Sequence, residues 1–235
     1  MIFAAGYGKR LLPLTEKTPK ALIPVKERPM LDWVINYLQS FGIQEVIINT
    51  HYLHDHISDH IKKTDFSLPI TLSHEKAILG TGGGLFQTKP FWGCDDFLVC
   101  NADILCNANL KDFNQHHQEQ EKWVTLAVNH RQSNSMLLID ETGLLIGRFK
   151  NNQEQIILKP TGSIFKVGFS GFHIISPNFF SLLKPPVEFS IIDEYFKLLK
   201  QGLEITTWNI GNAYWEDIGT LETLNKANYE FPGGN

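Results

Sequence analysis

The residues best suited to chemistry lie in a glycine-containing loop near the amino terminus, Ala4–Thr15. Its small residues include Ala5, Gly6 and Gly8, and its basic pair is Lys9 and Arg10. Small residues let backbone N–H groups approach an anion closely, and an arginine can grip phosphate oxygens in a forked geometry. Lys20 follows Pro19 and can reach back to the same place. These features predict a loop that binds a triphosphate.

Three other interpretations of this loop compete with triphosphate binding. A dinucleotide-binding fingerprint needs a third glycine where Leu11 stands, and a phosphate-binding Walker loop needs Gly-Lys-Ser/Thr. The second motif is absent here and also from the glycine-rich stretch Gly80–Gly84. The plainest alternative is a glycine turn with exposed basic residues. The apolar residues before the loop and the later Pro19-Lys20 pair favour triphosphate binding over that turn.

Two aspartates are candidate metal ligands. Asp103 follows the apolar run Phe97–Cys100, and Asp217 precedes a predicted final helix. Mg²⁺ typically takes one or two carboxylates together with substrate phosphate oxygens. An aspartate after a strand also commonly forms a turn or caps a helix, although Thr220 is the better cap for the final helix. We expect Asp103 and Asp217 to hold Mg²⁺.

A second glycine-rich stretch, Leu79–Gly84, is expected to be a loop whose backbone approaches a flat ligand, most simply a nucleobase. Its predicted nucleotide-binding residues are Leu79, Gly80, Thr81 and Gly82. Four histidines between His51 and His60 could suggest zinc, but no glutamate or cysteine completes a ligand pattern. The histidines are therefore predicted to lie on a solvated helix face. The three cysteines, Cys94, Cys100 and Cys106, are predicted to be inert core thiols.

The elements that must position these residues alternate between strand and helix through the first half. Short apolar runs such as Val46–Ile48 and Phe97–Cys100 are separated by helical patterns, which predicts an α/β fold with a Rossmann-like, mainly parallel sheet flanked by helices. Ligands of such sheets gather beyond the carboxyl ends of the strands. From about Trp123, strands separated by turns dominate. We expect a single domain with a nucleotide-binding half, 1–122, and a sugar-binding half, 123–235.

Composition narrows the class of protein. The chain has 235 residues, is 43% hydrophobic and carries a net charge of −4, which argues against a nucleic-acid partner. No apolar run approaches the roughly 20 residues that cross a bilayer, and the first residues lack the pattern of a secretory signal. An odd number of cysteines without a CxxC pair suits a reducing compartment. We expect a cytoplasmic protein with no membrane partner, either a monomer or a small homo-oligomer.

These residues together resemble the sugar-1-phosphate nucleotidyltransferase family. That family has a strand, a Gly-x-Gly-x-Arg loop, Pro-Leu-Thr and Pro-Lys-(small)-Leu, which appear here as Gly6–Arg10, Pro13–Thr15 and Pro19–Leu22. The likeness continues through Leu79–Gly84, Asn101–Asp103 and Trp215–Thr220. Within the family, Thr81–Gly84 and Phe169–Gly171 are most similar to N-acetylmuramate-1-phosphate uridylyltransferases of cell-wall recycling. Mannose-1-phosphate guanylyltransferases are the next most similar.

The resemblance implies a Mg²⁺-dependent transferase that joins a nucleoside triphosphate, UTP in the first case, to a sugar-1-phosphate and releases pyrophosphate. It implies that Arg10, Lys20 and Asp103 are catalytic, with Arg10 on the β- and γ-phosphates. Asn101, Lys159 and Gly171 would contact the sugar substrate. GTP with mannose-1-phosphate is the alternative, and a non-catalytic nucleotide-sensing domain of the same fold is another.

Three positions differ from the family pattern. Ala102 stands where a glycine is usual, and Leu158 replaces the glutamate of a Glu-Lys-Pro motif that contains Lys159. Residues 130–136 differ from the segment with which the most similar enzymes contact their sugar. The identity of the sugar is therefore the least determined part of the prediction.

Overall fold

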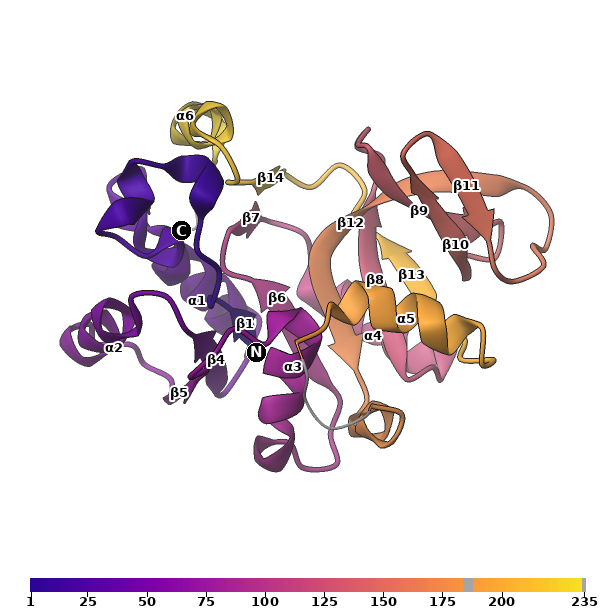
Figure 1. The fold of residues 1–235 in the computed structure, drawn as a ribbon, viewed down its shortest axis with the longest axis horizontal. Helices are drawn as coiled ribbons and strands as arrows, with labels where there is room; N and C mark the ends of the chain where they lie inside the picture. Colours follow the sequence, from indigo (N-terminus) through magenta and orange to yellow (C-terminus); the bar gives the residue numbers. More distant parts are fainter. Residues whose placement is uncertain (184–187, 234–235) are drawn as a thin grey trace. The chain divides into compact units, whose positions relative to one another are not determined.

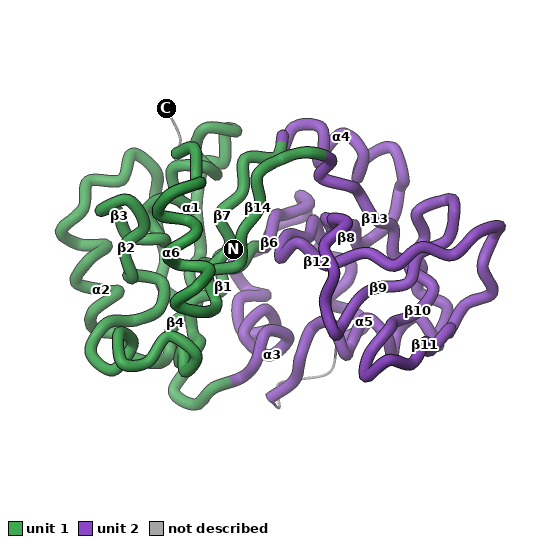
Figure 2. The backbone as a smooth tube through the Cα atoms, turned by 90° about the horizontal axis from the view of Figure 1, so that it is seen from above, with its two compact units in different colours: residues 1–78, 100–108, 212–235 green, residues 79–99, 109–211 purple. Residues whose placement is uncertain are grey.

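The computed structural model describes residues 1–183 and 188–233, which divide into two compact units (Figures 1 and 2). Unit 1 comprises residues 1–78, 100–108 and 212–235, and unit 2 comprises residues 79–99 and 109–211. Each unit is therefore assembled from segments that are distant in sequence. The predicted division of function at residue 122 stays a prediction, because these units are defined by contacts and not by ligands.

The core of unit 1 is a parallel sheet formed from short apolar strands. β1 (Ile2–Phe3) lies between β4 (Val46–Thr50) and the end of β6 (Phe97–Asn101), and β5 (Ile70–His74) pairs with the other side of β4. Ile2 is paired with both Ile48 and Cys100, and all three side chains are buried. This arrangement confirms the predicted α/β fold with a parallel sheet.

Helices α1 (Met30–Ser40), α2 (His54–Lys63) and α6 (Leu221–Glu230) complete unit 1. Helix α1 buries Leu31, Val34, Ile35 and Leu38, which recur at helical spacing in the sequence. Thr220 caps α6 through a reciprocal hydrogen-bonded box with Thr223, as the sequence predicted for Thr220. Two short antiparallel pairs also belong here: β2 (Pro24–Val25) with β3 (Arg28–Pro29), and β7 (Ile104–Cys106) with β14 (Trp215–Asp217).

Unit 2 contains a mixed sheet. Its strands are β8 (Val124–Asn129), β9 (Ser135–Asp140), β10 (Leu145–Lys150), β11 (Gln153–Ile156), β12 (Ile164–Ile175) and β13 (Thr206–Asn209). They lie in the order β11-β10-β9-β12-β8-β13, and only the pairing of β8 with β13 is parallel. The helices of unit 2 are α3 (Gly80–Gln87), α4 (Leu110–Gln120) and α5 (Ile191–Leu199). No helix in the described ranges, 1–183 and 188–233, is long and apolar enough to cross a membrane.

The structure corrects the expectation of a loop at Gly80–Gly84, because these residues form the first turns of α3. The glycines serve close packing. A methyl group on Gly82 would lie 2.1 Å from the ring of Phe189, and the backbone N–H of Gly82 donates to the Phe189 carbonyl oxygen at 2.9 Å. A side chain at Gly82 would push Phe189 away, so the absence of one allows the contact.

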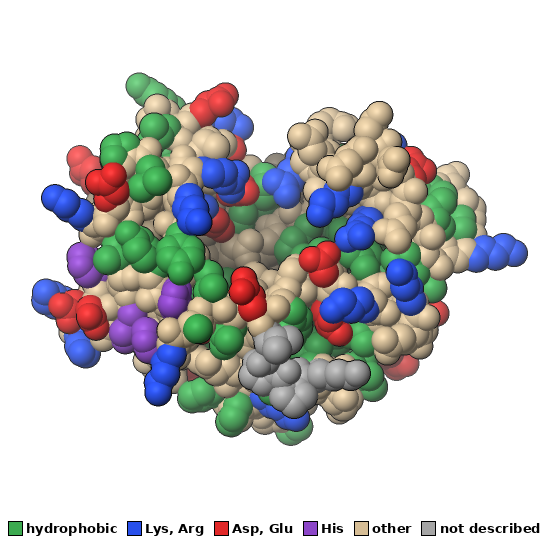
Figure 3. Space-filling model, in the orientation of Figure 1, with side chains coloured by type: hydrophobic (Ala, Val, Ile, Leu, Met, Phe, Trp, Pro, Cys, Tyr) green, Lys and Arg blue, Asp and Glu red, His purple; other side chains and the backbone are tan. Residues whose placement is uncertain are grey.

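His54, His56 and His60 lie on helix α2 as predicted, and two of them have polar partners, whereas the prediction is wrong for His51, which precedes the helix. Histidine side chains gather on the face of unit 1 that carries this helix (Figure 3). His60 Nε2 lies 2.6 Å from Asp32 Oδ1, and His54 Nδ1 lies 2.7 Å from Thr50 Oγ1. Within the described residues no group of three or more histidine, cysteine or acidic side chains could hold a metal ion.

The prediction of three core thiols holds for two cysteines and is wrong for Cys94, which is exposed. Cys100 lies in β6 and Cys106 in β7, and both are buried. Burial raises the pKa of the Cys100 thiol to about 12 and also raises the pKa of Cys106. The two buried thiols are therefore poor nucleophiles. Cys94 lies outside any strand, in a turn that leaves its side chain in solvent.

Candidate active site

The loop Ala4–Thr15 leaves β1 and is closed by its own hydrogen bonds. The backbone N–H of Leu11 donates to the Gly8 carbonyl oxygen at 2.9 Å, and Thr15 Oγ1 donates to the same oxygen at 3.0 Å. These bonds place Lys9 and Arg10 in a short 3-10 helix with both side chains exposed. The loop therefore presents its two cations to solvent on a fixed backbone.

Lys20 lies beyond this loop and reaches Asp103. Its Nζ forms an ion pair and hydrogen bond with Asp103 Oδ2, although 83 positions separate the residues. The two side chains are 14% and 26% exposed, so both remain partly accessible to a ligand. The structure thus brings together two of the three residues predicted to be catalytic.

Asp217 lies on a strand directly beside the one that follows Asp103. In the pairing of β7 with β14, Asp217 is the register partner of Ile104. The backbone N–H of Ile218 donates to the Asp103 carbonyl oxygen at 2.9 Å. The backbones of the two predicted metal ligands are therefore neighbours, with Lys20 on the Asp103 side of the pair.

Arg10 approaches the same place from the loop. A methyl group on Gly219 would lie 2.5 Å from Nη2 of Arg10, so the guanidinium group covers the backbone of Gly219. Gly219 follows Asp217 by two residues, and its N–H donates to the Asp217 carbonyl oxygen at 2.9 Å. The structure therefore brings the predicted phosphate-binding arginine to the segment that carries a predicted metal ligand.

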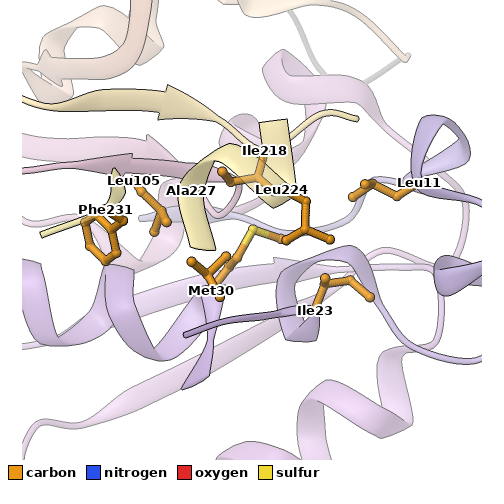
Figure 4. Close-up of a cluster of buried hydrophobic side chains, with 9 residues drawn as sticks. Leu11, Ile23, Met30, Leu105, Ile218, Leu224, Ala227 and Phe231 are labelled. Atoms are coloured by element: carbon orange, nitrogen blue, oxygen red, sulfur yellow. The ribbon is translucent and has the colours of Figure 1, made fainter. Parts of the chain in front are cut away.

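A buried apolar cluster explains why these distant segments meet (Figure 4). Each polar residue has an anchor in the cluster: Leu11 follows Arg10, Leu105 lies two residues after Asp103, and Ile218 follows Asp217. The cluster consists of Leu11, Ile23, Val25, Met30, Leu105, Ile218, Leu224, Ala227 and Phe231. Burial of apolar surface therefore fixes the backbone beside each charged side chain, so the charges need not attract one another to assemble.

The donor set of this site suits Mg²⁺. Two carboxylates, Asp103 just before β7 and Asp217 at the end of the adjacent β14, supply hard oxygen ligands. This ion usually completes its shell with water and substrate phosphate oxygens. Asp103 and Asp217 are the residues that would hold it. Lys20 already neutralises part of the charge of Asp103, which makes the pair of aspartates compatible with a bound polyanion.

The remaining predicted site residues of unit 1 frame this centre. Ala5 is buried at the start of the loop, whereas Gly6 is exposed and has open space where a side chain would stand. Asn101 is the last residue of β6, two positions before Asp103, and is paired with Phe3 of β1. The glycine-rich loop follows β1, and Asn101 and Asp103 lie at and just beyond the end of β6, at the same edge of the parallel sheet. This is where ligands of such sheets gather.

Unit 2 contains the other predicted residues. Leu79 and Thr81 are hydrogen bonded to the segment before α5: the Phe189 N–H donates to the Leu79 carbonyl oxygen at 3.0 Å, and the Ile191 N–H donates to Thr81 Oγ1 at 3.0 Å. Gly80 and Thr81 line a cavity of about 830 Å³ together with residues of β10, β11 and α5. Its charged lining residues are Arg148, Glu188, Asp193, Lys197 and Lys200.

Lys159 and Gly171 are not among the residues that line this cavity. Lys159 is exposed in the segment after β11. Gly171 is buried within β12, at a φ of 81° and beside a shift in register against β8. Their predicted contacts with a sugar substrate stay predictions.

Three residues at the site were not predicted from the sequence. Asn49 accepts a hydrogen bond from the backbone N–H of Ala4 at 2.8 Å, and its own amide donates to Glu75 Oε1 at 2.7 Å. Gly219, which makes room for Arg10, is the third residue involved. The signal for Asn49 and Glu75 was present, since Asn49 is the penultimate residue of β4 and Glu75 directly follows β5.

Comparison with known proteins decides the family. The model of the nucleotidyl transferase family matches residues 1–232 of the chain. This chain belongs to the nucleotidyl transferase family. The match spans both units and includes every residue described in the site above.

Two relatives show how similar this chain is to known proteins and how much of their length it spans. A mannose-1-phosphate guanyltransferase of Kluyveromyces lactis is 30% identical over 229 residues. A mannose-1-phosphate guanylyltransferase catalytic subunit beta of Xenopus tropicalis is 27% identical over 226 residues. In both cases the alignment covers 93% of this chain but 60% of the relative, so the chain spans about three fifths of their length.

Solved structures support the fold. HddC from Yersinia pseudotuberculosis superposes with a TM-score of 0.81 at 24% identity, covering 98% of this chain and 97% of that one. The fold is therefore that of a structurally characterised protein of similar size, and the predicted fold class is confirmed. The two relatives are named as mannose-1-phosphate guanylyltransferases, which is the alternative that the sequence predicted.

Proposed function

We propose that this nucleotidyl transferase joins a nucleoside triphosphate to a sugar-1-phosphate and releases pyrophosphate. The observation that carries the proposal is the convergence in unit 1 of Arg10, Lys20, Asp103 and Asp217 on one apolar cluster. Two cations and two carboxylates at the end of a parallel sheet suit a reaction between two phosphate-bearing substrates. The names of the curated relatives support the same class of reaction.

The chemistry follows from bringing two polyanions together. The sugar-1-phosphate oxygen attacks the α-phosphorus of the triphosphate, the bond from that phosphorus to the bridging oxygen breaks, and pyrophosphate leaves with the electron pair. Arg10 and Lys9 bind the β- and γ-phosphates and stabilise the charge on the leaving group. Lys20 lies between the α-phosphate and the incoming phosphate and holds them in line.

Asp103 and Asp217 would hold Mg²⁺. When bound, this ion neutralises charge on the phosphate oxygens and orients them. The sugar phosphate needs no general base, because its oxygen is already ionised near neutral pH. Leu79–Gly82 of unit 2 are proposed to lie against the nucleobase. Asn101 of unit 1 is proposed to contact the sugar, Lys159 its phosphate, and Gly171 the sugar substrate.

The substrate pair has two candidates, each favoured by a different observation. The Thr81–Gly84 and Phe169–Gly171 segments favour UTP with N-acetylmuramate-1-phosphate, which would place the enzyme in cell-wall recycling. The relatives that are 27% and 30% identical favour GTP with mannose-1-phosphate. In both cases we propose a cytoplasmic, Mg²⁺-dependent enzyme that acts as a monomer or small homo-oligomer.

A matrix of nucleotides and sugars tests the proposal. The purified chain is mixed with Mg²⁺, one of UTP, GTP, CTP or dTTP, and one of several sugar-1-phosphates, and pyrophosphate is measured. We expect release that requires both substrates, with one preferred pair. Nucleotide binding without pyrophosphate release from any pair would instead favour a non-catalytic nucleotide-sensing domain.

A further inference from the structure

The segment that ends β4, Asn49–Tyr52, contacts the glycine-rich loop near its beginning, in its middle and at its end. Asn49 is bonded to the backbone of Ala4, and His51 Nε2 lies 3.2 Å from the Tyr7 hydroxyl oxygen. The Tyr52 hydroxyl oxygen lies 3.1 Å from the carbonyl oxygens of Thr15 and Glu16. Three of these four consecutive residues, Asn49, His51 and Tyr52, therefore contact the loop or the residue that follows it.

Just beyond the last register pair of β1 with β4, the Asn49 side chain accepts the hydrogen bond from the backbone of Ala4. Phe3 is the last residue of β1 and is the register partner of Asn49. The next backbone N–H, that of Ala4, donates to Asn49 Oδ1 at 2.8 Å. A backbone N–H taken out of water needs a hydrogen-bond acceptor. Asn49 Oδ1 is that acceptor at the point where the chain leaves the strand and enters the loop.

Glu75 fixes the orientation of the Asn49 amide. Asn49 is 2% exposed and Glu75 is fully buried, and Asn49 Nδ2 donates to Glu75 Oε1 at 2.7 Å. A carboxylate accepts only, so the amide must direct its NH₂ group to Glu75 and its oxygen to Ala4. The Glu75 N–H donates to the Thr50 carbonyl oxygen at 2.8 Å, which holds Glu75 just beyond β5.

The same glutamate determines the hydrogen-bonding role of His51. His51 Nδ1 lies 2.8 Å from the Glu75 carbonyl oxygen. A carbonyl oxygen accepts, so Nδ1 carries a proton toward it, and in that tautomer Nε2 accepts from the Tyr7 hydroxyl. Lys9 Nζ lies over the face of the Tyr7 ring, 5.4 Å from its centroid. A polar chain therefore runs from Glu75 to a predicted phosphate-binding lysine.

We infer that the segment Asn49–Tyr52, backed by Glu75, consists of positioning residues that hold the glycine-rich loop in the shape that receives a triphosphate. The inference rests on the proposed function, because it assigns the triphosphate to this loop. A loop that is already ordered loses less conformational freedom when the ligand binds. The backbone N–H groups and Arg10 are then in place before the nucleotide arrives.

Exchanging the amide and the carboxylate between positions 49 and 75 tests the hydrogen bond that joins Asn49 to Glu75. Asn49→Asp places a second carboxylate against Glu75, whereas Asn49→Asp combined with Glu75→Gln restores one amide and one carboxylate in reversed order. Binding of Mg·GTP and of Mg·UTP is measured by calorimetry. We expect about tenfold weaker binding for the single variant and recovery to within about threefold for the double variant. Asn36→Asp, an exposed change on α1, is the matched control and should bind like wild type.

Two results would overturn the inference: binding by Asn49→Asp equal to that of the Asn36→Asp control, or a double variant that binds no better than the single one. If Asn49→Asp does not fold, Tyr52→Phe and Tyr7→Phe replace it, with the exposed Tyr229→Phe as control. We then expect KM for the triphosphate to rise about threefold to tenfold, with KM for the sugar phosphate unchanged. A triphosphate KM equal to that of the Tyr229→Phe control would contradict the inference.

The two proposals fail in different ways. If wild type binds Mg·GTP or Mg·UTP but no pair of substrates releases pyrophosphate, the proposed reaction is wrong and the positioning role still stands on the binding data. If pyrophosphate is released and the variants bind and react like their controls, the positioning role alone is wrong. If wild type binds neither nucleotide and no pair in the four-nucleotide matrix releases pyrophosphate, both are wrong.

Discussion

Lys20 and Asp103 form an ion pair between the segment after the glycine-rich loop and the segment after β6. In the proposed mechanism each of them also has a second partner: a phosphate group for Lys20 and Mg²⁺ for Asp103. The pair therefore keeps both charges at the site before substrates bind. Neither residue is deeply buried, so the ion pair itself is expected to contribute little to folding stability.

The competition between Lys20 and the metal for Asp103 can be measured. Lys20→Ala removes a cation beside the carboxylate, so we expect the free protein to bind Mg²⁺ more tightly than wild type. The same variant should lose about 100-fold in kcat, because a charged group that stabilises the transition state is gone. Calorimetry and pyrophosphate release check the two effects, with Lys17→Ala, an exposed lysine of the same segment, as control. Unchanged Mg²⁺ affinity would show that Asp103 is not a metal ligand.

Gly219 controls the position of Arg10. In Gly219→Ala the new methyl group would displace the guanidinium group, and we expect KM for the triphosphate to rise about tenfold with little change in Tm. Gly93→Ala is the matched control, since nothing lies within 4 Å of a side chain there. In an Arg10→Ala background the Gly219→Ala change should add nothing further. If Gly219→Ala raised KM for the triphosphate by the same factor in wild type and in the Arg10→Ala variant, Gly219 would act independently of Arg10.

Leu11 anchors the loop in the apolar cluster. Its side chain is fully buried, so Leu11→Ala should lower the free energy of unfolding by about 2–5 kcal/mol through lost transfer energy and the cavity left behind. Leu12→Ala, which removes the same atoms from a side chain 50% exposed, should change it by less than about 0.5 kcal/mol. Urea unfolding followed by circular dichroism measures both. Similar values for the two variants would contradict the assigned role of the cluster.

Much of this architecture could be predicted from the sequence, because short apolar runs and helical spacing report directly on burial. The strands β4 and β6, the helix α1 and the cap at Thr220 are examples. The pairing of β7 with β14 could not be predicted. Each of these strands has three residues, and Trp215 pairs with Cys106, more than 100 positions away, so neither periodicity nor local turn residues indicates the contact.

The candidate site also contains residues that could be predicted from the sequence and residues that could not. The glycine-rich loop, Lys20 and the two aspartates carry their signal in residue type and local spacing. The stabilising role of Leu11 in the cluster and the room that Gly219 makes for Arg10 depend on packing between distant segments. The helix at Gly80–Gly84 was mistaken for a loop for a related reason. A side chain at Gly82 would meet the ring of Phe189 and one at Gly80 would meet its backbone, and Phe189 lies more than 100 residues further along the chain.

Stability should depend on pH through His173. Its side chain is buried in unit 2, its Nδ1 lies 2.8 Å from the Tyr195 hydroxyl, and burial lowers its pKa from 6.5 to about 3. Between these two values the unfolded chain binds a proton that the folded chain does not, so stability falls as the pH falls from 6.5 toward 3. The slope from this residue approaches about 1.4 kcal/mol per pH unit.

Replacing the titrating group isolates that contribution. His173→Gln keeps a hydrogen-bonding group opposite Tyr195 but cannot be protonated, so its unfolding free energy should vary less steeply with pH. Urea unfolding at several values between pH 7 and pH 4 gives both slopes. His56→Gln, an exposed histidine of α2, should leave the slope near that of wild type. Parallel slopes for wild type and His173→Gln would mean that His173 is protonated in the folded protein.

The most direct test of the central claim is the rate of Mg²⁺-dependent pyrophosphate release by wild type, Asp103→Asn and Asp217→Asn, using the substrate pair that the matrix identifies. Each variant keeps the size of its side chain and removes one proposed metal ligand charge. We predict that both rates fall by about 100-fold or more while Tm is retained. Rates equal to that of wild type in either folded variant would contradict the assignment of this site as the centre of nucleotidyl transfer.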